Sequence, residues 1–255
     1  MDVFLRISDF IRGIPASLSQ LGADINIAFI KDDRWKYLVT GLGNTLRVTF
    51  FALILGLSIG VIIALVRSSW DKVSPTMKKG AGRFFLGLAN GICKLYLTVI
   101  RGTPVVVQLL IIFFVLLPPS FDKNLAGVIA FGINSGAYVS EIIRAGIMSV
   151  DAGQTEAGRS LGFNYTSTMA YIVLPQAFKN MLPSLANEFI VLLKETSVFG
   201  FVGGTDLNRA AQIIISRTYS AALPYFTIAL IYLVMVMFFS WLVGILERRL
   251  RASDH

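Results

Sequence analysis

Long uncharged stretches alternate with short charged ones along most of the chain. A helix rises 1.5 Å per residue, so roughly 20 apolar residues cross a hydrocarbon core of about 30 Å. Four stretches approach or exceed this length: residues 48–66, 102–121, 124–140 and 218–246. A fifth candidate, about residues 183–203, is interrupted by Glu188, Lys194 and Glu195. The pattern predicts about five membrane-spanning segments, the fourth of which is polar.

Composition supports a membrane protein made of helices. The chain has 255 residues, of which 55% are hydrophobic and only 15% are charged, whereas soluble chains carry roughly 25% charged residues. The mean hydropathy is +0.70. The apolar runs are much longer than barrel strands and do not alternate, so they predict helices. We therefore expect an all-α, polytopic membrane protein.

The first 40 residues differ from the rest. Phe4, Ile7, Ile11 and Ile14 begin an apolar stripe at helical spacing that continues to residue 25, with interruptions at Gly13 and Pro15. Either a broken amphipathic helix at the membrane interface or a simple packing arm fits this pattern. No secretory signal is predicted. We divide the chain into an arm, residues 1–40, and a transmembrane domain, residues 41–250.

Basic residues predict the orientation. Seven Lys or Arg residues lie between the first two predicted spans, one lies between the second and third, and three lie in the tail. Since short basic loops stay in the cytoplasm, the first connection and the C-terminus are expected inside and the N-terminus outside. The net charge of +8 then reflects a membrane rather than nucleic acid.

The stretch 84–101 precedes the predicted second span. Arg83, Lys94 and Arg101 are spaced to share one helical face. A short helix along the cytoplasmic headgroups and one long helix kinked near Gly102–Pro104 are the two interpretations.

Several chemistries have no residues to support them. Cys93 is the single cysteine and His255, the last residue, is the single histidine. A disulfide framework, a His-ligated metal and a Ser-His-Asp triad are therefore excluded. No stretch reads G-x-x-x-x-G-K-[ST], so this chain has no P-loop for ATP. No catalytic residues, metal site or cofactor are predicted.

The connection at about residues 144–183 contains a regular polar segment, Gly153–Gly162. Thr155 could cap a short helix there, and Gly162 could end it in a left-handed conformation. Its small residues would suit insertion into a groove of another protein. An ordinary helix–loop–helix connector fits the same residues.

This segment resembles the EAA loop of the membrane subunits of ATP-binding-cassette (ABC) importers. Six residues fall at the matching positions: Glu156, Ala157, Gly162, Ile172, Leu174 and Pro175. Gly158 replaces the second alanine of the pattern. The resemblance implies that residues 150–178 form a cytoplasmic coupling loop that docks on an ATPase subunit, through Glu156, Ala157, Gly158, Gly162, Leu174 and Pro175.

Further motifs are similar to those of the polar-amino-acid permeases of this family. They are Arg101-Gly102-Thr103-Pro104, Asn134-Ser135-Gly136-Ala137-Tyr138, Asn187-Glu188-Phe189 and Leu193-Lys194-Glu195-Thr196-Ser197. Glu195 stands where the family normally has Asp.

The resemblance covers residues 37–250 and implies a type I ABC importer permease in the bacterial inner membrane. It also implies the partners of such a permease. These are two ATP-binding cassette subunits, a second permease chain (identical or similar), an extracytoplasmic solute-binding protein and a polar amino acid.

Ionisable groups within membrane spans are candidates for function because their burial is costly. The substrate-path candidates are Gln108, Tyr138, Asn187, Glu188, Glu195 and Thr196. The alternatives are a structural Lys194–Glu195 pair and packing roles for Gln108 and Tyr138. Arg101, Glu141 and Arg144 are gate or structural candidates, and Glu141 and Arg144 could pair across one helical turn. Gly56 and Gly60 have a spacing that permits close helix approach.

Two other classes of protein agree less well with the sequence. A secondary transporter could use the intramembrane carboxylates for ion coupling, but five spans without an inverted repeat argue against it. A membrane-embedded enzyme would need a nucleophile–base pair or a metal cluster, and the sequence contains no candidate for either.

Overall fold

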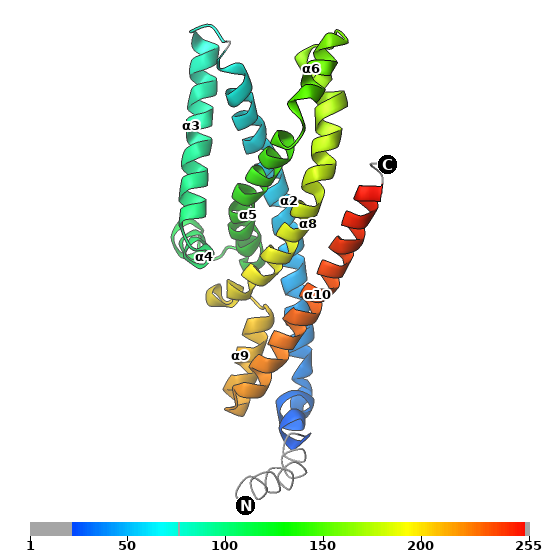
Figure 1. Ribbon diagram of the computed structural model, residues 1–255. Helices are drawn as coiled ribbons and strands as arrows, with labels where there is room; N and C mark the ends of the chain where they lie inside the picture. Colours follow the sequence, from blue (N-terminus) through cyan, green and yellow to red (C-terminus); the bar gives the residue numbers. More distant parts are fainter. Residues whose placement is uncertain (1–21, 76, 253–255) are drawn as a thin grey trace, which may run out of the picture.

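Five long helices form the body of the described part of the protein (Figure 1). The computed structural model describes residues 22–75 and 77–252, with the backbone alone for 251 and 252. The long helices are α2 (Trp35–Val73), α3 (Ala81–Gly102), α5 (Lys123–Met148), α8 (Leu174–Glu195) and α10 (Ala222–Ala252). Short elements connect them: η1 (Asn26–Ile30), η2 (Lys31–Asp33), α4 (Val105–Ile111), η3 (Ile112–Leu116), α6 (Ala152–Ser160), α7 (Tyr165–Thr168), η4 (Met169–Val173), η5 (Thr196–Val202) and α9 (Leu207–Thr218).

Four of the described helices are long and apolar enough to cross a membrane: α2, α3, α5 and α10. The fifth long helix, α8, contains four ionisable residues, Lys179, Glu188, Lys194 and Glu195. The prediction of an all-α polytopic protein is confirmed for the described residues, whereas α8, the predicted polar fourth span, is not among the four apolar helices.

The predicted second span is wrong. The uncharged run at residues 102–121 predicts a span, but the helix long enough to cross is α3, and residues 105–116 form only α4 and η3. Thr103 and Pro104 are extended, with ψ angles of 146° and 138°. The ring of a proline disfavours the α conformation of the residue before it, so the helix breaks at Thr103.

Neither interpretation of residues 84–101 holds. The helix α3 stands upright beside α2 and ends at the break, rather than lying flat or continuing as one kinked helix (Figure 1). Its basic residues interrupt the apolar run, which is why the sequence pattern favours the uncharged stretch after Pro104 instead.

Helix α8 begins earlier than predicted. The sequence predicts a start near residue 183, but α8 starts at Leu174 and carries Pro183 in its interior. After Glu195 the chain forms η5 rather than continuing the helix. The first span is likewise longer than its uncharged core, because α2 already begins at Trp35. Residues 1–21 of the predicted arm lie outside the described residues.

Interlocking glycines join α2 and α5. A Cβ on Gly56 would lie 3.0 Å from Ser135, and one on Gly60 would overlap Val139. In the opposite direction, Gly132 and Gly136 of α5 sit against Leu55 and Ile59 of α2. Each helix therefore places side chains over the glycines of the other, which confirms the close approach expected of Gly56 and Gly60.

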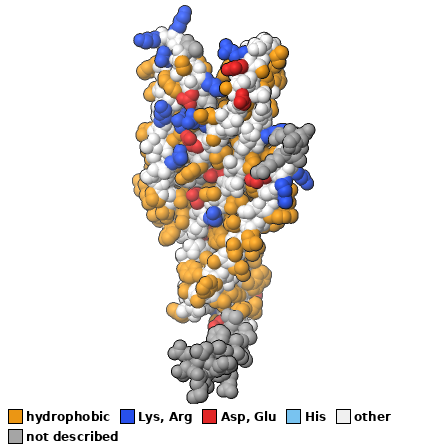
Figure 2. Space-filling view, in the orientation of Figure 1, with side chains coloured by type: hydrophobic (Ala, Val, Ile, Leu, Met, Phe, Trp, Pro, Cys, Tyr) orange, Lys and Arg blue, Asp and Glu red, His pale blue; other side chains and the backbone are white. Residues whose placement is uncertain are grey.

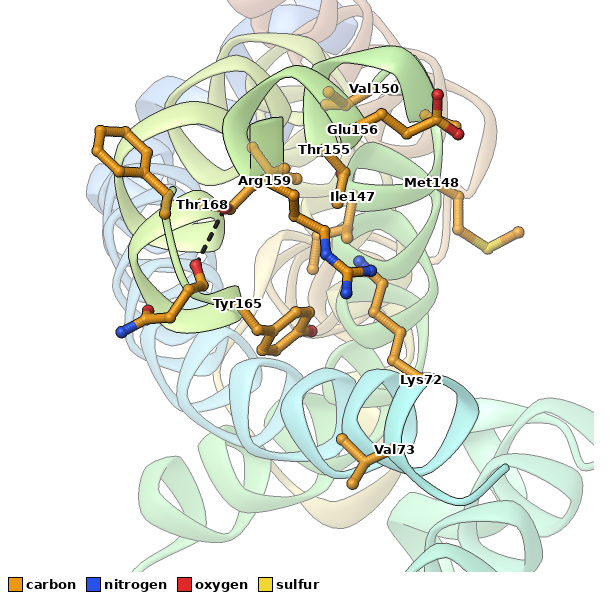
Figure 3. A pocket seen from close by; sticks show the side chains of 14 residues that line it. Lys72, Val73, Ile147, Met148, Val150, Thr155, Glu156, Arg159, Tyr165 and Thr168 are labelled. Atoms are coloured by element: carbon orange, nitrogen blue, oxygen red, sulfur yellow. Dashed lines mark hydrogen bonds between the residues drawn. The ribbon is translucent and has the colours of Figure 1, made fainter. Parts of the chain in front are cut away.

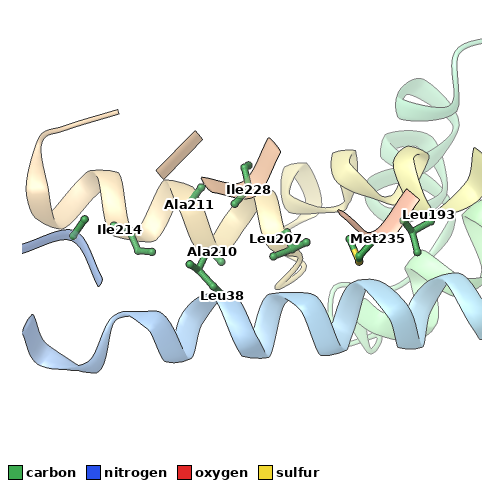
Figure 4. Packing of buried hydrophobic residues seen from close by; sticks show 9 residues of the cluster. Leu38, Leu193, Leu207, Ala210, Ala211, Ile214, Ile228 and Met235 are labelled. Atoms are coloured by element: carbon green, nitrogen blue, oxygen red, sulfur yellow. The ribbon is translucent and has the colours of Figure 1, made fainter. Parts of the chain in front are cut away.

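An apolar core fills the end of the molecule where α2 begins. Leu38 of α2 packs with Leu207, Ala211 and Ile214 of α9 and with Ile228 of α10 (Figure 4). Burial of these side chains holds α9 alongside the first turns of α2. The remaining surface of α10 exposes large apolar side chains, among them Phe226, Leu230 and Val234, as expected of a lipid-facing helix.

The two ends of the bundle differ. The short helix α6 and the end of α10 point toward one end, and α2 begins at the other (Figure 1). In Figure 2, charged side chains on the visible face gather toward the α6 end, whereas the coloured part of the narrower region below is mostly apolar.

Candidate functional site

The predicted coupling loop forms a short helix, α6, with a defined start and end. Asp151 caps it, accepting a hydrogen bond from the Gly153 amide over 2.6 Å. The expected Thr155 cap is therefore wrong, and Asp151 was the capping signal that the sequence offered. Gly162 has φ +85°, and the Phe163 amide donates to the Gly158 carbonyl over 3.1 Å. The predicted left-handed stop at Gly162 is confirmed.

The packing of Gly158 explains its departure from the alanine of the EAA pattern. It is buried, and a Cβ there would lie 2.8 Å from Ile172 and 2.9 Å from Thr168. Glu156 and Ala157 are both exposed. One face of α6 thus packs on η4 and α7, and the other is free for a partner. Leu174 and Pro175 begin α8 directly after η4.

A cavity of about 860 Å³ lies between α6 and the end of α2. Arg159, Lys72 and Tyr165 point into it, and the Glu156 carboxylate points away (Figure 3). Lys72 Nζ lies 5.7 Å from the centre of the Tyr165 ring, an arrangement that favours cation–π attraction. Burial raises the pKa of the Tyr165 hydroxyl above its ordinary value, so the group is neutral at physiological pH.

Glu188 lies in the interior of the bundle. It is 7% exposed and accepts a hydrogen bond from the Ser135 hydroxyl over 2.8 Å. Asn187 is exposed, and Thr196 is buried with its hydroxyl bonded to the Leu193 carbonyl over 2.8 Å. Asn187 and Thr196 therefore differ from Glu188 in their surroundings, whereas Glu195 follows Glu188 by seven residues, about two turns of α8, and lies on the same face.

Lys194 and Glu195, the alternative structural pair, attract each other electrostatically but are not in direct ion-pair contact. Lys194 is exposed and Glu195 half-buried. The ion pairs among the described residues do not join them.

The side chain of Gln108 forms hydrogen bonds that stabilise the break between α3 and α4. Its amide nitrogen lies within hydrogen-bond distance of the Ile100 carbonyl (2.8 Å) and the Thr103 carbonyl (3.0 Å). Its oxygen accepts from Asn134 of α5 over 2.9 Å. The side chain therefore satisfies carbonyls at the end of α3, which Pro104 cannot do because it lacks an N–H.

Glu141 pairs with residues of other helices. Its Oε1 lies 2.7 Å from Arg67 Nη1, and its Oε2 lies 4.0 Å from Arg101 Nη1. Arg144 instead pairs with Asp71 over 2.9 Å. The expected Glu141–Arg144 pair is wrong, because the two side chains reach to different neighbours. Tyr138 lies with its ring centre 5.8 Å from the Arg101 guanidinium.

Sequence reasoning missed Arg67, Asp71 and Ser135 as contacts of these candidates. Arg67 was used only in the count of basic residues that predicts the membrane orientation. Its position directly after the uncharged run 48–66 was a signal that it could lie near other helices. No group of three or more potential metal ligands occurs among the described residues.

Comparison with known proteins agrees with this geometry. Residues 80–252 match the family described as "Binding-protein-dependent transport system inner membrane component". A putative glutamine transport system permease protein of Rickettsia bellii is 40% identical over 220 residues, covering 85% of this chain and 94% of the relative. An arginine transport system permease protein of Bacillus subtilis is 37% identical, with 86% and 94% coverage.

Solved structures agree as well. A crystal structure described as an amino acid ABC transporter with histidines matches with a TM-score of 0.75 and 43% identity, covering 87% of this chain and 98% of that one. An inward-facing MetNI methionine ABC transporter matches with a TM-score of 0.69, 17% identity, and coverage of 86% and 98%. At that identity the second match supports the fold alone. The chain belongs to the family of binding-protein-dependent transport system inner membrane components.

Proposed function

We propose that this chain is the membrane subunit of an ATP-driven importer of polar amino acids. Its relatives are named as glutamine, arginine and L-cystine permeases, and the chain spans nearly their whole length. Two ATPase subunits would bind at the α6 end, and a second permease chain would complete the path. A solute-binding protein would deliver the amino acid at the opposite end, with the N-terminus outside and the C-terminus in the cytoplasm.

The arrangement of α6 is the observation that carries this proposal. Its outer face, with Glu156 and Ala157, is available to a partner, while Gly158 rests on Thr168 and Ile172. The segment from Thr168 runs without a loop through η4 into α8, which contains Glu188. A push on α6 would therefore reach the buried carboxylate as a rigid-body movement of one continuous helical segment.

Movement alone does not give direction to transport. The ATPase must bind the inward-open and outward-open states with different affinities, because only differential affinity shifts an equilibrium between states. Closure of the ATPase pair on ATP would supply that difference and α6 would transmit it.

The test is purification of the complex from its native membrane, followed by identification of the co-purifying subunits. Reconstituted with its partners, the complex is then screened with individual amino acids for stimulation of ATP hydrolysis and for uptake. We expect an ATPase and a solute-binding protein, and stimulation by one or a few polar amino acids. Uptake that persists without ATP but collapses with an ionophore would contradict the proposal and favour a secondary transporter.

A further inference from the structure

Three basic side chains and one acidic side chain line a single open pocket. The pocket has a volume of about 460 Å³ and is lined by Arg67 of α2, Lys94 and Arg101 of α3, and Glu141 of α5. Three positive charges face one negative charge, so the pocket has a positive balance. Such an excess at close quarters attracts small anions.

The guanidinium groups have hydrogen-bonding capacity left over. Arg101 is 48% exposed, lies 4.0 Å from Glu141, and makes no hydrogen bond with any described residue. Arg67 donates one bond to Glu141, but its Nε is buried without a partner among the described residues. An arginine offers five N–H donors in a planar fork that matches a carboxylate. The donors here are in place before any ligand arrives.

Glu141 connects this pocket with two others. It also lines a groove of about 620 Å³ that includes Ser149, Asn180 and Ser184 and a smaller one with Arg144. In the sequence of α8, Ser184 precedes Glu188 by about one helical turn. A groove with polar groups along it therefore leads from the basic pocket toward the helix that carries the buried carboxylate.

We propose that Arg67 and Arg101, on either side of Glu141, bind the carboxylate group of the transported amino acid as it leaves toward the α6 end. The inference rests on the proposed function and adds a site to it. Without substrate, Glu141 occupies part of the guanidinium surface. The substrate carboxylate takes the free donors of Arg101, and Glu141 limits the affinity so that the substrate can leave again.

An anionic lipid phosphate is the other source of such an anion. The groove that continues from Glu141 has a mixed lining, with hydroxyl and amide groups at Ser149, Asn180 and Ser184 beside the apolar Ile142 and Met181. An acyl chain would cover these polar groups, whereas a small zwitterion can form hydrogen bonds with them.

The first test measures the sign of the potential without relying on transport. Cys93→Ala removes the native thiol, and Thr98→Cys places one at an exposed position that lines the pocket. The full complex is held in phosphatidylcholine nanodiscs. The rates at which the introduced thiol reacts with an anionic and a cationic methanethiosulfonate reagent of equal size are compared with those of a free thiol.

We expect the anionic reagent to be favoured, and Arg101→Gln to lower the rate ratio roughly three- to tenfold. Arg101→Lys keeps the charge and should preserve the ratio. Arg83→Gln, on the same helix but outside the pocket, is the matched control and should leave it unchanged. A ratio equal to that of the free thiol, or one insensitive to Arg101→Gln, overturns the proposal even if the complex imports amino acids.

The second test asks for the carboxylate itself. L-glutamine and L-arginine, and in parallel their α-carboxamides, are added while the Thr98→Cys variant is labelled. Protection by a free amino acid but not by its amide supports the site, whereas equal protection or none overturns it. In a third arm the nanodiscs contain phosphatidylglycerol. A loss of anionic labelling there, without protection by amino acids, assigns the pocket to a lipid headgroup and also overturns the proposal.

Discussion

The hydroxyl of Ser135 and the carboxylate of Glu188 face each other in the bundle interior, with 2.8 Å between their oxygens. The bond links α5 to α8 where Gly56 of α2 also lies against Ser135. Three helices therefore meet at one hydrogen-bonded acid. A buried carboxyl group without its donor would bear the full penalty of desolvation, so this bond supports both stability and any transport role of Glu188.

Ser135→Ala is expected to destabilise the protein by about 1–3 kcal/mol, because it leaves Glu188 without its donor. Ser58→Ala is the control, since the Ser58 hydroxyl is exposed and bonds only within its own helix. Thermal unfolding of the detergent-solubilised complex measures both. Equal melting temperatures for the two variants would contradict the structural role of the bond.

Glu188→Gln tests transport separately from stability. The amide oxygen can still accept from Ser135, so folding should be little affected, whereas removal of the carboxyl group should lower amino-acid uptake. Uptake and substrate-stimulated ATP hydrolysis equal to those of the wild type would exclude Glu188 from the translocation path.

Gly60→Ala is expected to destabilise the contact between α2 and α5. The new Cβ would overlap Val139 and lie 3.0 Å from the Ser140 backbone nitrogen, which cannot move aside easily. Overpacking of this kind costs about 1–3 kcal/mol. Gly43→Ala in the same helix meets nothing within 4 Å and should be neutral or stabilising by up to about 1 kcal/mol. Melting temperatures that shift alike in the two variants would rule out this account.

The glycine at the end of α6 should control coupling. Gly162→Val forces a β-branched residue to φ +85°, so we expect α6 to lose its stop and substrate-stimulated ATP hydrolysis to fall. Gly162→Asn tolerates the left-handed conformation and should retain most of the activity. Membrane insertion is the control for both. Two variants with the same ATPase activity would argue that the conformation of residue 162 is unimportant.

Gly158→Ala restores the family's EAA sequence, but we expect it to weaken coupling in this chain. The gain in helix propensity is about 1 kcal/mol, while the new methyl group would press on Thr168 and Ile172. Gly158→Ala with Ile172→Val makes room at one of the two contacts and should recover part of the coupling, measured as substrate-stimulated ATP hydrolysis. Improved coupling by Gly158→Ala alone would contradict the packing argument.

Hydrophobic patterning predicted the number and class of the long helices because lipid imposes a minimum apolar length on each one. It placed the second span wrongly because it treated Lys94 and Arg101 as loop residues. Those cations lie in a pocket with Glu141, so they interrupt the apolar run without ending the helix. A membrane span can contain charged residues when oppositely charged side chains of neighbouring helices compensate them. Uncharged runs alone therefore do not locate every span.

Local sequence signals predicted the end of the coupling helix correctly, but they did not predict which residues pair with the buried charges. The left-handed stop at Gly162 follows from a single residue type. The pairing of Glu141 with Arg67, 74 positions away, depends on how α2 and α5 pack and could not be read from the spacing of Glu141 and Arg144. The same holds for the contact of Glu188 with Ser135.

The interlocked glycines of α2 and α5 have a consequence for the transport cycle. Each of these helices packs side chains directly over the glycines of the other. A slide by a fraction of a turn would move those side chains into clashes with bulkier neighbours, so intermediate positions are disfavoured. We expect α2 and α5 to move as one unit through the cycle, with α3 and α8 as the parts that tilt against it. A spectroscopic distance between α2 and α5 should then stay constant whether or not ATP is bound.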